Sequence, residues 1–317
     1  MELILTGNAA IALAARDAGV ALGVGYPGTP STETLENLAR LEGGVAQWAP
    51  NEKVALEVGV GVAFGGRRAL VTMKHVGLNV AADPLFTASY TGVAGGLAVL
   101  VADDPGMHSS QNEQDSRHYA RAAKVPMLEP SDSQEAYEFT RLAFQLSEQF
   151  DTPVLLRTTT RLSHGKSTVT PGQRETALPA PQPPMNPAKY VMVPAFARVR
   201  HRLVEERQRR VREWANAAPL TRAELRDTAV GIITSGINYQ YVREVAPTAS
   251  VLKLGLVYPL PLEAIRAFAA RVETLYVVEE LDPIIEEQLA AAGIAVIGKE
   301  RFPPLGEFTP AVVATGL

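Results

Sequence analysis

Short apolar runs alternate with segments of helical periodicity along the first half of the chain. The apolar runs predict strands at residues 20–24, 45–48, 69–73, 96–102 and 153–157. The periodic segments predict helices at residues 7–18, 52–66 and near 80–91, and two more that begin near Ser31 and Ser131. Strands that alternate with helices predict an α/β fold whose mostly parallel sheet is covered by helices on both faces.

A second and smaller set of alternating elements occupies the C-terminal part. Strands are predicted at residues 230–234, 251–256, 275–278 and 294–297, with helices at 239–245, 262–270 and 283–292. Between the two sets lie a proline-rich segment, 168–189, and a charged helix, 195–214. We therefore expect a first domain at 1–167, a linker with a bridging helix at 168–227, and a second domain at 228–317.

Composition describes an ordinary globular protein and excludes several kinds of site. The 317 residues are 46% hydrophobic and 20% charged, and they contain no cysteine. Disulfides, thiolate zinc sites and cysteine-ligated iron–sulfur clusters are therefore impossible within these residues. The five histidines show no paired ligand spacing, so no metal site is predicted.

The charge pattern predicts neither a nucleic-acid partner nor a membrane. The formal net charge is −4, and the basic run from Arg198 to Arg212 is interrupted by Glu205 and Glu206. No apolar run approaches the roughly 18 residues that span a bilayer. An acidic residue at position 2 argues against a signal peptide. We expect a cytoplasmic protein.

Residues 51–79 combine one carboxylate with a nearly uncharged, glycine-bearing segment. Glu52 precedes a predicted helix that contains Gly59, Gly61, Gly65 and Gly66. Each glycine costs a helix roughly 1 kcal/mol relative to alanine, which is compensated where another backbone or a flat ring must come close. From these residues alone, two interpretations of Glu52 remain. It is either a buried acid–base group or an ordinary acidic residue at a helix N-terminus that is capped by Asn51.

A glycine-rich stretch, Gly23-Val-Gly-Tyr-Pro-Gly28, has the spacing of a dinucleotide-binding fingerprint but not its chemistry. That fingerprint needs free backbone N–H groups at the start of a helix. Pro27 and Pro30 remove two of these donors and prevent a helix there. We therefore reject a nucleotide-binding site at this turn.

Several longer motifs are specific enough to indicate a family. They are Tyr26-Pro-Gly-Thr-Pro-Ser31, Asn51-Glu-Lys-Val-Ala-Leu-Glu57, Thr72-Met-Lys-His-Val-Gly-Leu-Asn79, and the run from Ala102 to Asp115, ADDPGMHSSQNEQD. With these motifs the sequence resembles the alpha subunits of indolepyruvate:ferredoxin oxidoreductases. These belong to the thiamine-diphosphate-dependent 2-oxoacid:acceptor oxidoreductases. The resemblance extends over nearly the whole chain.

The resemblance implies a fold and a set of site residues. Residues 1–167 would be the pyrimidine-binding domain of a thiamine enzyme, and residues 228–317 a smaller domain like the C-terminal domain of transketolase. Glu52 falls on the glutamate that exchanges a proton with the aminopyrimidine ring, and a partly dry setting would suit that carboxyl. The other cofactor-binding residues would be Tyr26, Pro27, His75, Gly77 and Asn79. The residues near the substrate would be Thr29, His108 and Arg117.

The same resemblance implies partners, because parts of the family pattern are missing here. Full-length relatives carry a diphosphate-binding domain with a magnesium motif, and ferredoxin-type clusters. We therefore expect thiamine diphosphate to be shared with a partner subunit that binds Mg²⁺, and [4Fe–4S] clusters and ferredoxin to receive the electrons. The substrates would be coenzyme A and a 2-oxoacid, with indolepyruvate or another arylpyruvate as the nearest guess. No arginine matches the one that pyruvate-specific relatives use for the carboxylate, since residues 97–101 are apolar.

Two alternative functions remain open at this point. The chain could be a non-catalytic subunit for assembly or regulation, which the presence of Glu52 and Thr29 argues against. It could also belong to a thiamine-dependent decarboxylase that transfers no electrons. A requirement for an electron acceptor and coenzyme A separates this alternative from the oxidative reaction.

Overall fold

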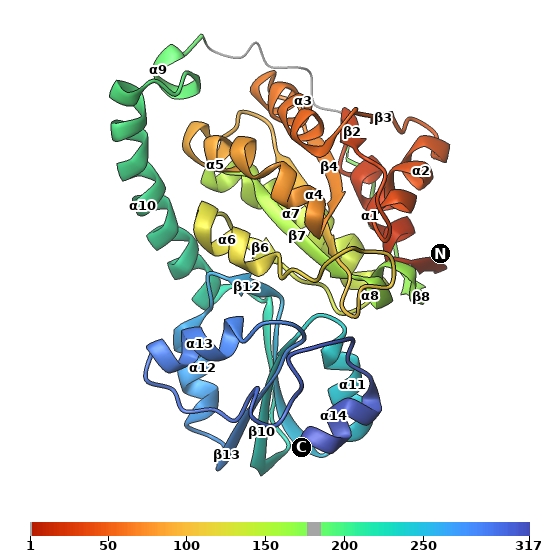
Figure 1. The fold of residues 1–317 in the computed structure, drawn as a ribbon, viewed down its shortest axis with the longest axis vertical. Coiled ribbons are helices and arrows are strands. Elements are labelled where there is room, and N and C mark those ends of the chain that lie inside the picture. The colour runs from red at the N-terminus through yellow and green to blue at the C-terminus, as the bar shows by residue number, and fades with distance from the viewer. Residues whose placement is uncertain (1, 176–184) are drawn as a thin grey trace.

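The computed structural model describes residues 2–175 and 185–317, so part of the predicted proline-rich linker, 176–184, lies outside the described residues. Within the described residues the strands form three sheets of seven, four and two strands. The larger sheet has the order β12-β6-β7-β5-β4-β2-β3, the smaller sheet the order β13-β10-β11-β9, and β1 pairs with β8. Figure 1 shows the larger sheet with its helices above the smaller sheet with its own helices.

The elements of the first half follow the predicted alternation closely. Its strands are β1 (Leu3–Thr6), β2 (Leu22–Gly25), β3 (Ala46–Trp48), β4 (Ala69–Lys74), β5 (Leu97–Asp103), β6 (Met127–Leu128), β7 (Val154–Thr159) and β8 (Lys166–Val169). Its helices are α1 (Gly7–Asp17), α2 (Thr32–Arg40), α3 (Glu52–Phe64), α4 (His75–Val80), α5 (Ala82–Thr91), α6 (Arg117–Ala123), α7 (Ser133–Phe150) and α8 (Thr160–His164).

The second half begins with the long helix and contains the smaller sheet. Its helices are α9 (Pro187–Tyr190), α10 (Pro194–Ala217), α11 (Asn238–Val245), α12 (Leu262–Ala269), α13 (Ile284–Ala291) and α14 (Pro310–Gly316). Its strands are β9 (Thr221–Glu224), β10 (Asp227–Ser235), β11 (Ala249–Leu254), β12 (Leu256–Tyr258) and β13 (Thr274–Val278).

Two apolar cores cover the two faces of the larger sheet. Because side chains alternate along a strand, Leu70 and Leu100 pack on one face and Val71 and Val99 on the other. The first face is covered mainly by α1 and α7, and the second mainly by α3 and α5. β2, β4, β5 and β7 run parallel. The predicted α/β fold with a mostly parallel, covered sheet is therefore confirmed.

The structure corrects two predicted strands and adds two features that the sequence did not predict. The run predicted as one strand at 251–256 is divided between two sheets, because β11 pairs in the smaller sheet and β12 pairs antiparallel with β6 in the larger one. Ile297 makes only an isolated bridge to Tyr276, so 294–297 is not a strand. Residues 75–79, for which no helix was predicted, form most of α4. The antiparallel pair β1–β8 was not predicted.

The charged helix α10 lies along the side of the molecule, from α9 down to the smaller half (Figure 1). Arg200 donates from Nε to the Tyr90 carbonyl over 2.6 Å, and Arg207 donates from Nη2 to Ser89 Oγ over 2.9 Å. These contacts hold α10 against α5, so part of its basic run serves packing. Within the described residues no helix is both long and apolar enough to cross a membrane.

The two halves meet at a buried network of charged side chains. Arg117 contacts Asp115 and Glu279 at 2.5 Å each, and it also donates to the backbone carbonyls of Glu280 and Asp282. Burial alone would raise the pKa of Asp115, but the adjacent guanidinium groups outweigh it and hold that pKa well below its usual range.

A second arginine completes this junction. Arg157 Nε lies 2.7 Å from Asp103 Oδ2, and Arg157 also pairs with Glu129. Glu129 in turn accepts a hydrogen bond of 2.9 Å from Ser235 Oγ in the other half. The division at residues 167 and 227 stays a prediction, while these contacts and the β6–β12 pairing join its two sides.

Candidate active site

A cavity of about 440 Å³ lies at the carboxyl ends of β2 and β4, where ligands bind in many parallel α/β sheets. It is lined by Tyr26, Pro27, Gly28, Thr29, Glu52, Lys74, Val76, Asn79, Val80, Ser109, Gln111, Asn112 and Gln114. These residues come from the turn after β2, the start of α3, the β4–α4 junction and the loop after β5. The fold thus brings five of the predicted site residues, Tyr26, Pro27, Thr29, Glu52 and Asn79, to one cavity.

Glu52 is both the first residue of a capped helix and part of the cavity wall. Asn51 Oδ1 accepts a hydrogen bond of 2.9 Å from the Val54 backbone N–H, which caps α3. The Glu52 side chain is only 9% exposed. The two interpretations of this residue are therefore compatible, since the cap fixes the helix start and the helix start presents the carboxyl to the cavity.

Glycine is required where α4 passes the Glu52 side chain. A Cβ at Gly77 would lie 2.6 Å from Glu52 Cγ and 2.7 Å from Glu52 Oε1, which is closer than real Cβ contacts. On the far side of α3, a Cβ at Gly59 would collide with Val71 of β4, while Gly61 has open space. Of the glycines for which the sequence predicted a close approach, Gly59 therefore has one and Gly61 does not, while the approach at Gly77 was not predicted.

His75 is not among the residues that line the cavity, but it contacts the loop that does. It is buried at the start of α4, with Nε2 3.0 Å from the Asn112 carbonyl oxygen and with no hydrogen-bond partner at Nδ1. Asn79, one turn later on α4, is exposed and accepts a hydrogen bond of 2.8 Å from the Tyr119 hydroxyl at Oδ1. His75 therefore positions the loop that carries Asn112.

The turn after β2 packs on the side chain of Lys74. A Cβ at Gly28 would lie 2.9 Å from Lys74 Cδ, so the lysine stem fills the space under this turn. Ser109 connects the same pieces, because its Oγ donates to the Thr29 carbonyl over 3.2 Å and its own carbonyl accepts from Lys74 Nζ over 2.9 Å. Thr29, Lys74 and Ser109 consequently form one side of the cavity.

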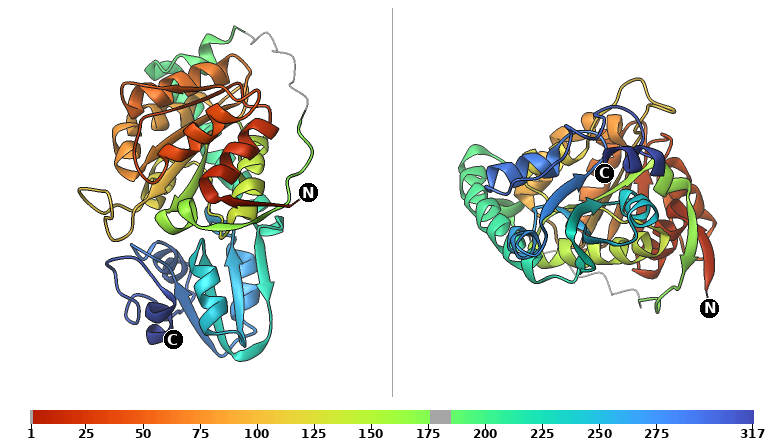
Figure 2. Two further views of the ribbon diagram at one scale, coloured as in Figure 1. Left: turned by 90° about the vertical axis from the view of Figure 1, so that its right-hand side faces the viewer. Right: turned by 90° about the horizontal axis from the view of Figure 1, so that it is seen from below.

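A buried aspartate organises the loop after β5, which extends from the body in Figure 2. Asp104 accepts hydrogen bonds from the Ser109 backbone N–H, from Ser110 Oγ and from Thr160 Oγ1 at 2.7–2.9 Å. Burial alone would raise the pKa of Asp104, but these hydrogen bonds outweigh it and lower that pKa. Asp104 therefore remains ionised and holds the loop over the cavity.

Two predicted substrate-binding residues lie outside the cavity lining. His108 is exposed, and its Nε2 lies 3.3 Å from Glu307 Oε2 of the second half. Arg117 is 1% exposed and is engaged by Asp115 and Glu279 in the buried junction. This placement supports a structural role for Arg117 rather than a contact with a small molecule.

Sequence reasoning did not single out Lys74, Gln111, Asn112 or Gln114, all of which line the cavity. One feature of the sequence could have indicated Lys74. It is the charged last residue of a strand whose other residues are uncharged and buried. Gln111, Asn112 and Gln114 have no such feature in the sequence. Only the folding of the loop around Asp104 brings them opposite Glu52.

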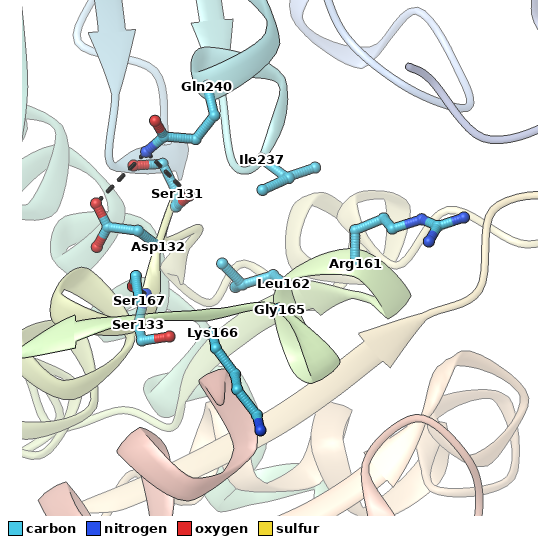
Figure 3. A pocket seen from close by; sticks show the side chains of 10 residues that line it. All are labelled: Ser131, Asp132, Ser133, Arg161, Leu162, Gly165, Lys166, Ser167, Ile237 and Gln240. Atoms are coloured by element: carbon cyan, nitrogen blue, oxygen red, sulfur yellow. Dashed lines mark hydrogen bonds between the residues drawn. The ribbon is translucent and has the colours of Figure 1, made fainter. Parts of the chain in front are cut away.

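A second cavity, of about 370 Å³, lies at the junction of the two halves (Figure 3). Its wall includes Asp132 at the start of α7 and Gln240 of α11, and the Gln240 amide donates weakly to the Ser131 carbonyl over 3.4 Å. None of the predicted site residues lines it. The predicted site residues that share a cavity are therefore all in the one that contains Glu52.

The comparisons identify the family. Residues 13–222 match the family described as pyruvate flavodoxin/ferredoxin oxidoreductase, thiamine diphosphate-binding. The chain belongs to this family. The matched residues include every residue that lines the cavity with Glu52.

Similar proteins point in the same direction. The chain is 41% identical to the indolepyruvate oxidoreductase subunit IorA of Archaeoglobus fulgidus, over 100% of this chain and 53% of that protein. It is 45% identical to IorA of Methanothermobacter thermautotrophicus, over 93% of this chain and 49% of that protein. The chain thus spans about half the length of these curated relatives.

One solved structure shares the fold. It is a 2-oxoglutarate:ferredoxin oxidoreductase from Magnetococcus marinus with 2-oxoglutarate, coenzyme A and succinyl-CoA bound. The match has a TM-score of 0.81 at 20% sequence identity, and it covers 99% of this chain and 64% of that one. At this identity the likeness concerns the arrangement of the elements.

The chemistry of the cavity fits the pyrimidine end of thiamine. A flat heterocycle with ring nitrogens and an exocyclic amine needs a carboxyl group, hydrogen-bonding amides and close approach by small residues. Glu52 supplies the carboxyl group and Asn79, Gln111 and Asn112 the amides, while Gly28 is a small residue in the same lining. The described lining contains only one cation, Lys74, which is little to hold a diphosphate.

Proposed function

We propose that this chain is the pyrimidine-binding part of a thiamine-dependent 2-oxoacid:ferredoxin oxidoreductase. The reaction would be the oxidative decarboxylation of an arylpyruvate such as indolepyruvate to an acyl-CoA, and the protein would act in the cytoplasm. The observation that carries the proposal is the position of Glu52. Its side chain lines the cavity and packs against Gly77. The names of the IorA relatives support the choice of substrate.

In this proposal the predicted site residues in and beside the cavity have defined tasks. Bound thiamine diphosphate supplies a nucleophilic carbon and takes up the electron pair that decarboxylation releases. Glu52 holds and exchanges a proton with the aminopyrimidine ring nitrogen. Tyr26 and Pro27 would provide the surface beside the ring. Gly77 leaves room for the Glu52 side chain, and His75 fixes the loop that carries Asn112. Thr29 and the loop that carries His108 lie on the side where the 2-oxoacid enters.

The diphosphate, the magnesium ion and the clusters would be bound by polypeptide outside these 317 residues. The described cavity has one cation, and the chain has no cysteine to hold a [4Fe–4S] cluster. A subunit with the diphosphate-binding domain would close the cavity. Electrons would pass through its clusters to ferredoxin, and coenzyme A would accept the acyl group.

The test is Glu52→Gln in the assembled enzyme. The amide keeps the size of the side chain but cannot exchange a proton, so we expect kcat to fall by about 10²–10⁴-fold. The affinity for thiamine diphosphate, measured by calorimetry, should fall much less. Reduction of ferredoxin with an arylpyruvate and coenzyme A measures the rate.

Glu57→Gln is the matched control, because Glu57 lies on the same helix and is exposed. Its kcat should equal that of the wild type. A Glu52→Gln enzyme that also keeps the wild-type rate would show that the carboxyl has no catalytic part, and it would favour an assembly role for the chain.

A further inference from the structure

Lys74 is the only cationic residue that lines the cavity with Glu52, among the described residues. It is the last residue of β4 and is 8% exposed. Its aliphatic stem lies under Gly28, which fixes the direction of the side chain. The ammonium group is therefore placed at the cavity wall by the sheet and by the turn after β2.

This ammonium group lies in the same cavity as Glu52 but forms no ion pair with a described carboxylate. Within the described part of the chain, Lys74 makes no ion pair, and its hydrogen-bond partner is the Ser109 carbonyl at 2.9 Å. An ammonium has three donors, so two remain for a ligand. Burying a charge without an opposite charge is costly, and the cost is relieved when an anion enters the same space.

The neighbours of Lys74 suit a carboxylate. Ser109 links the lysine to Thr29, because it accepts from Lys74 Nζ and donates to the Thr29 carbonyl. Among the described contacts the Thr29 hydroxyl has no hydrogen-bond partner, so a second donor is available beside the ammonium. A carboxylate between these two groups would gain charge-assisted hydrogen bonds.

The rest of the cavity limits what the carboxylate can be attached to. Beyond Lys74, the lining contains exposed apolar side chains, with Tyr26 at 40% and Val80 at 48% exposure, and the carboxyl of Glu52. A second carboxylate in the same ligand would meet no further cation among the described lining residues. An apolar or aromatic group of the ligand would pack against the exposed side chains of Tyr26 and Val80.

We propose that Lys74 binds the carboxylate of the 2-oxoacid and selects a substrate with a single carboxylate and an apolar side chain. This inference rests on the proposed function. Lys74 is a binding residue that orients the acid, and Glu52 keeps the proton exchange.

The first test compares Lys74→Met with the wild type in the assembled enzyme, using two inhibitors of equal shape. These are 3-phenylpropionate and its neutral amide, 3-phenylpropionamide. A lost charge-assisted hydrogen bond corresponds to about a 10- to 100-fold change. We expect the KM for phenylpyruvate to rise and the preference for the acid over the amide to disappear, while amide inhibition and thiamine diphosphate affinity stay the same.

Lys74→Arg and Lys166→Met are the comparison variants. The arginine variant should recover part of the preference for the acid, since it keeps the charge. Lys166 is exposed on β8 and lines the other cavity, so its replacement should leave KM and the preference unchanged. Equal inhibition of the wild type and of Lys74→Met by 3-phenylpropionate would overturn the inference about Lys74. This holds even if both enzymes oxidise phenylpyruvate.

The second test does not depend on turnover. Lysines labelled with ¹³C at Cε in the 317-residue chain are titrated with 3-phenylpropionate, the amide or inorganic phosphate, and the Lys74 signal is assigned by its loss in Lys74→Arg. The acid should shift this signal, and the amide should not. A phosphate shift as large as that of the acid would overturn carboxylate recognition. An assembled wild type that oxidises no 2-oxoacid would instead overturn the proposed function, and the titration would still decide whether Lys74 binds a carboxylate.

Discussion

Among single residues, Gly77 allows the sharpest prediction. A methyl group at this position would occupy the space of the Glu52 carboxyl, 2.6–2.7 Å from its atoms. Gly77 lies in α4, so alanine should also favour the helix by up to about 1 kcal/mol. Because the collision opposes this helix preference, we expect Gly77→Ala to displace the Glu52 side chain and to weaken thiamine diphosphate binding by at least tenfold in the assembled enzyme, by calorimetry.

Gly61→Ala is the control for this prediction. Gly61 lies in α3 with open space around its Cα, so alanine brings the same helix preference without a collision. This variant should bind thiamine diphosphate as the wild type does. Normal binding by Gly77→Ala as well would show that the Glu52 carboxyl can move without consequence.

The sequence was informative at this scale where a residue acts through its own segment. Glu52 stands out because a carboxylate opens an apolar, glycine-bearing helix, and Thr29 lies in a distinctive turn. Lys74 does not stand out, because its surroundings come from Gly28 and Ser109, far away in the sequence. Arg117 was assigned to the substrate by the family resemblance, while Glu279 and its other partners in the second half lie more than 160 residues away.

At the scale of elements, α6 is fixed to the loop after β13 by one buried arginine. Replacing Arg117 with methionine would leave Asp115 and Glu279 buried without their guanidinium. Breaking a buried pair in this way costs about 3–5 kcal/mol. We expect Arg117→Met to lose that much free energy of unfolding in urea denaturation of the full chain.

Arg121→Met provides a comparison on the same helix. Arg121 Nη1 lies 3.6 Å from Glu287 Oε2, and both side chains are about half exposed. Solvent screens such a pair, so its loss should cost less than about 1 kcal/mol. An equal loss of unfolding free energy in Arg117→Met and Arg121→Met would mean that the buried ion pairs of Arg117 contribute no more to stability than an exposed pair.

The sequence predicted which elements exist better than it predicted where they pair. The run at 251–256 is apolar apart from Lys253 and Gly255, and periodicity cannot show that the chain changes sheets at Gly255. At that point the glycine passes close to Phe139 of α7, a contact set by the tertiary fold. Residues 294–297 are apolar enough for a strand but make only one bridge, at Ile297, beside β13.

For the whole molecule, the junction predicts a pH dependence of stability. Burial raises the pKa of Glu280 to about 7, from 4.5, although the Phe308 N–H donates to it and Arg157 is near. The native state therefore binds a proton more tightly than the unfolded state. This contribution to stability is complete below about pH 4.5 and is lost as the pH rises through about 7, by about 3 kcal/mol.

Glu280→Gln removes the titration and keeps an oxygen to accept from Phe308. We expect its free energy of unfolding to match the wild type at pH 4.5 and to exceed it by up to about 3 kcal/mol at pH 8, in urea denaturation. Glu273→Gln, at an exposed position, should show no such difference between the two pH values. A Glu280→Gln gain that is equal at both pH values would rule out this titration.

The pairing of β12 with β6 has a consequence for biosynthesis. β6 is complete once Leu128 has been translated, but its antiparallel neighbour begins at Leu256. During the translation of the residues in between, the nascent chain carries a sheet edge with no strand beside it, and such edges invite pairing with other chains. The emerging polypeptide can close its cofactor-binding half only after much of the second half has left the ribosome.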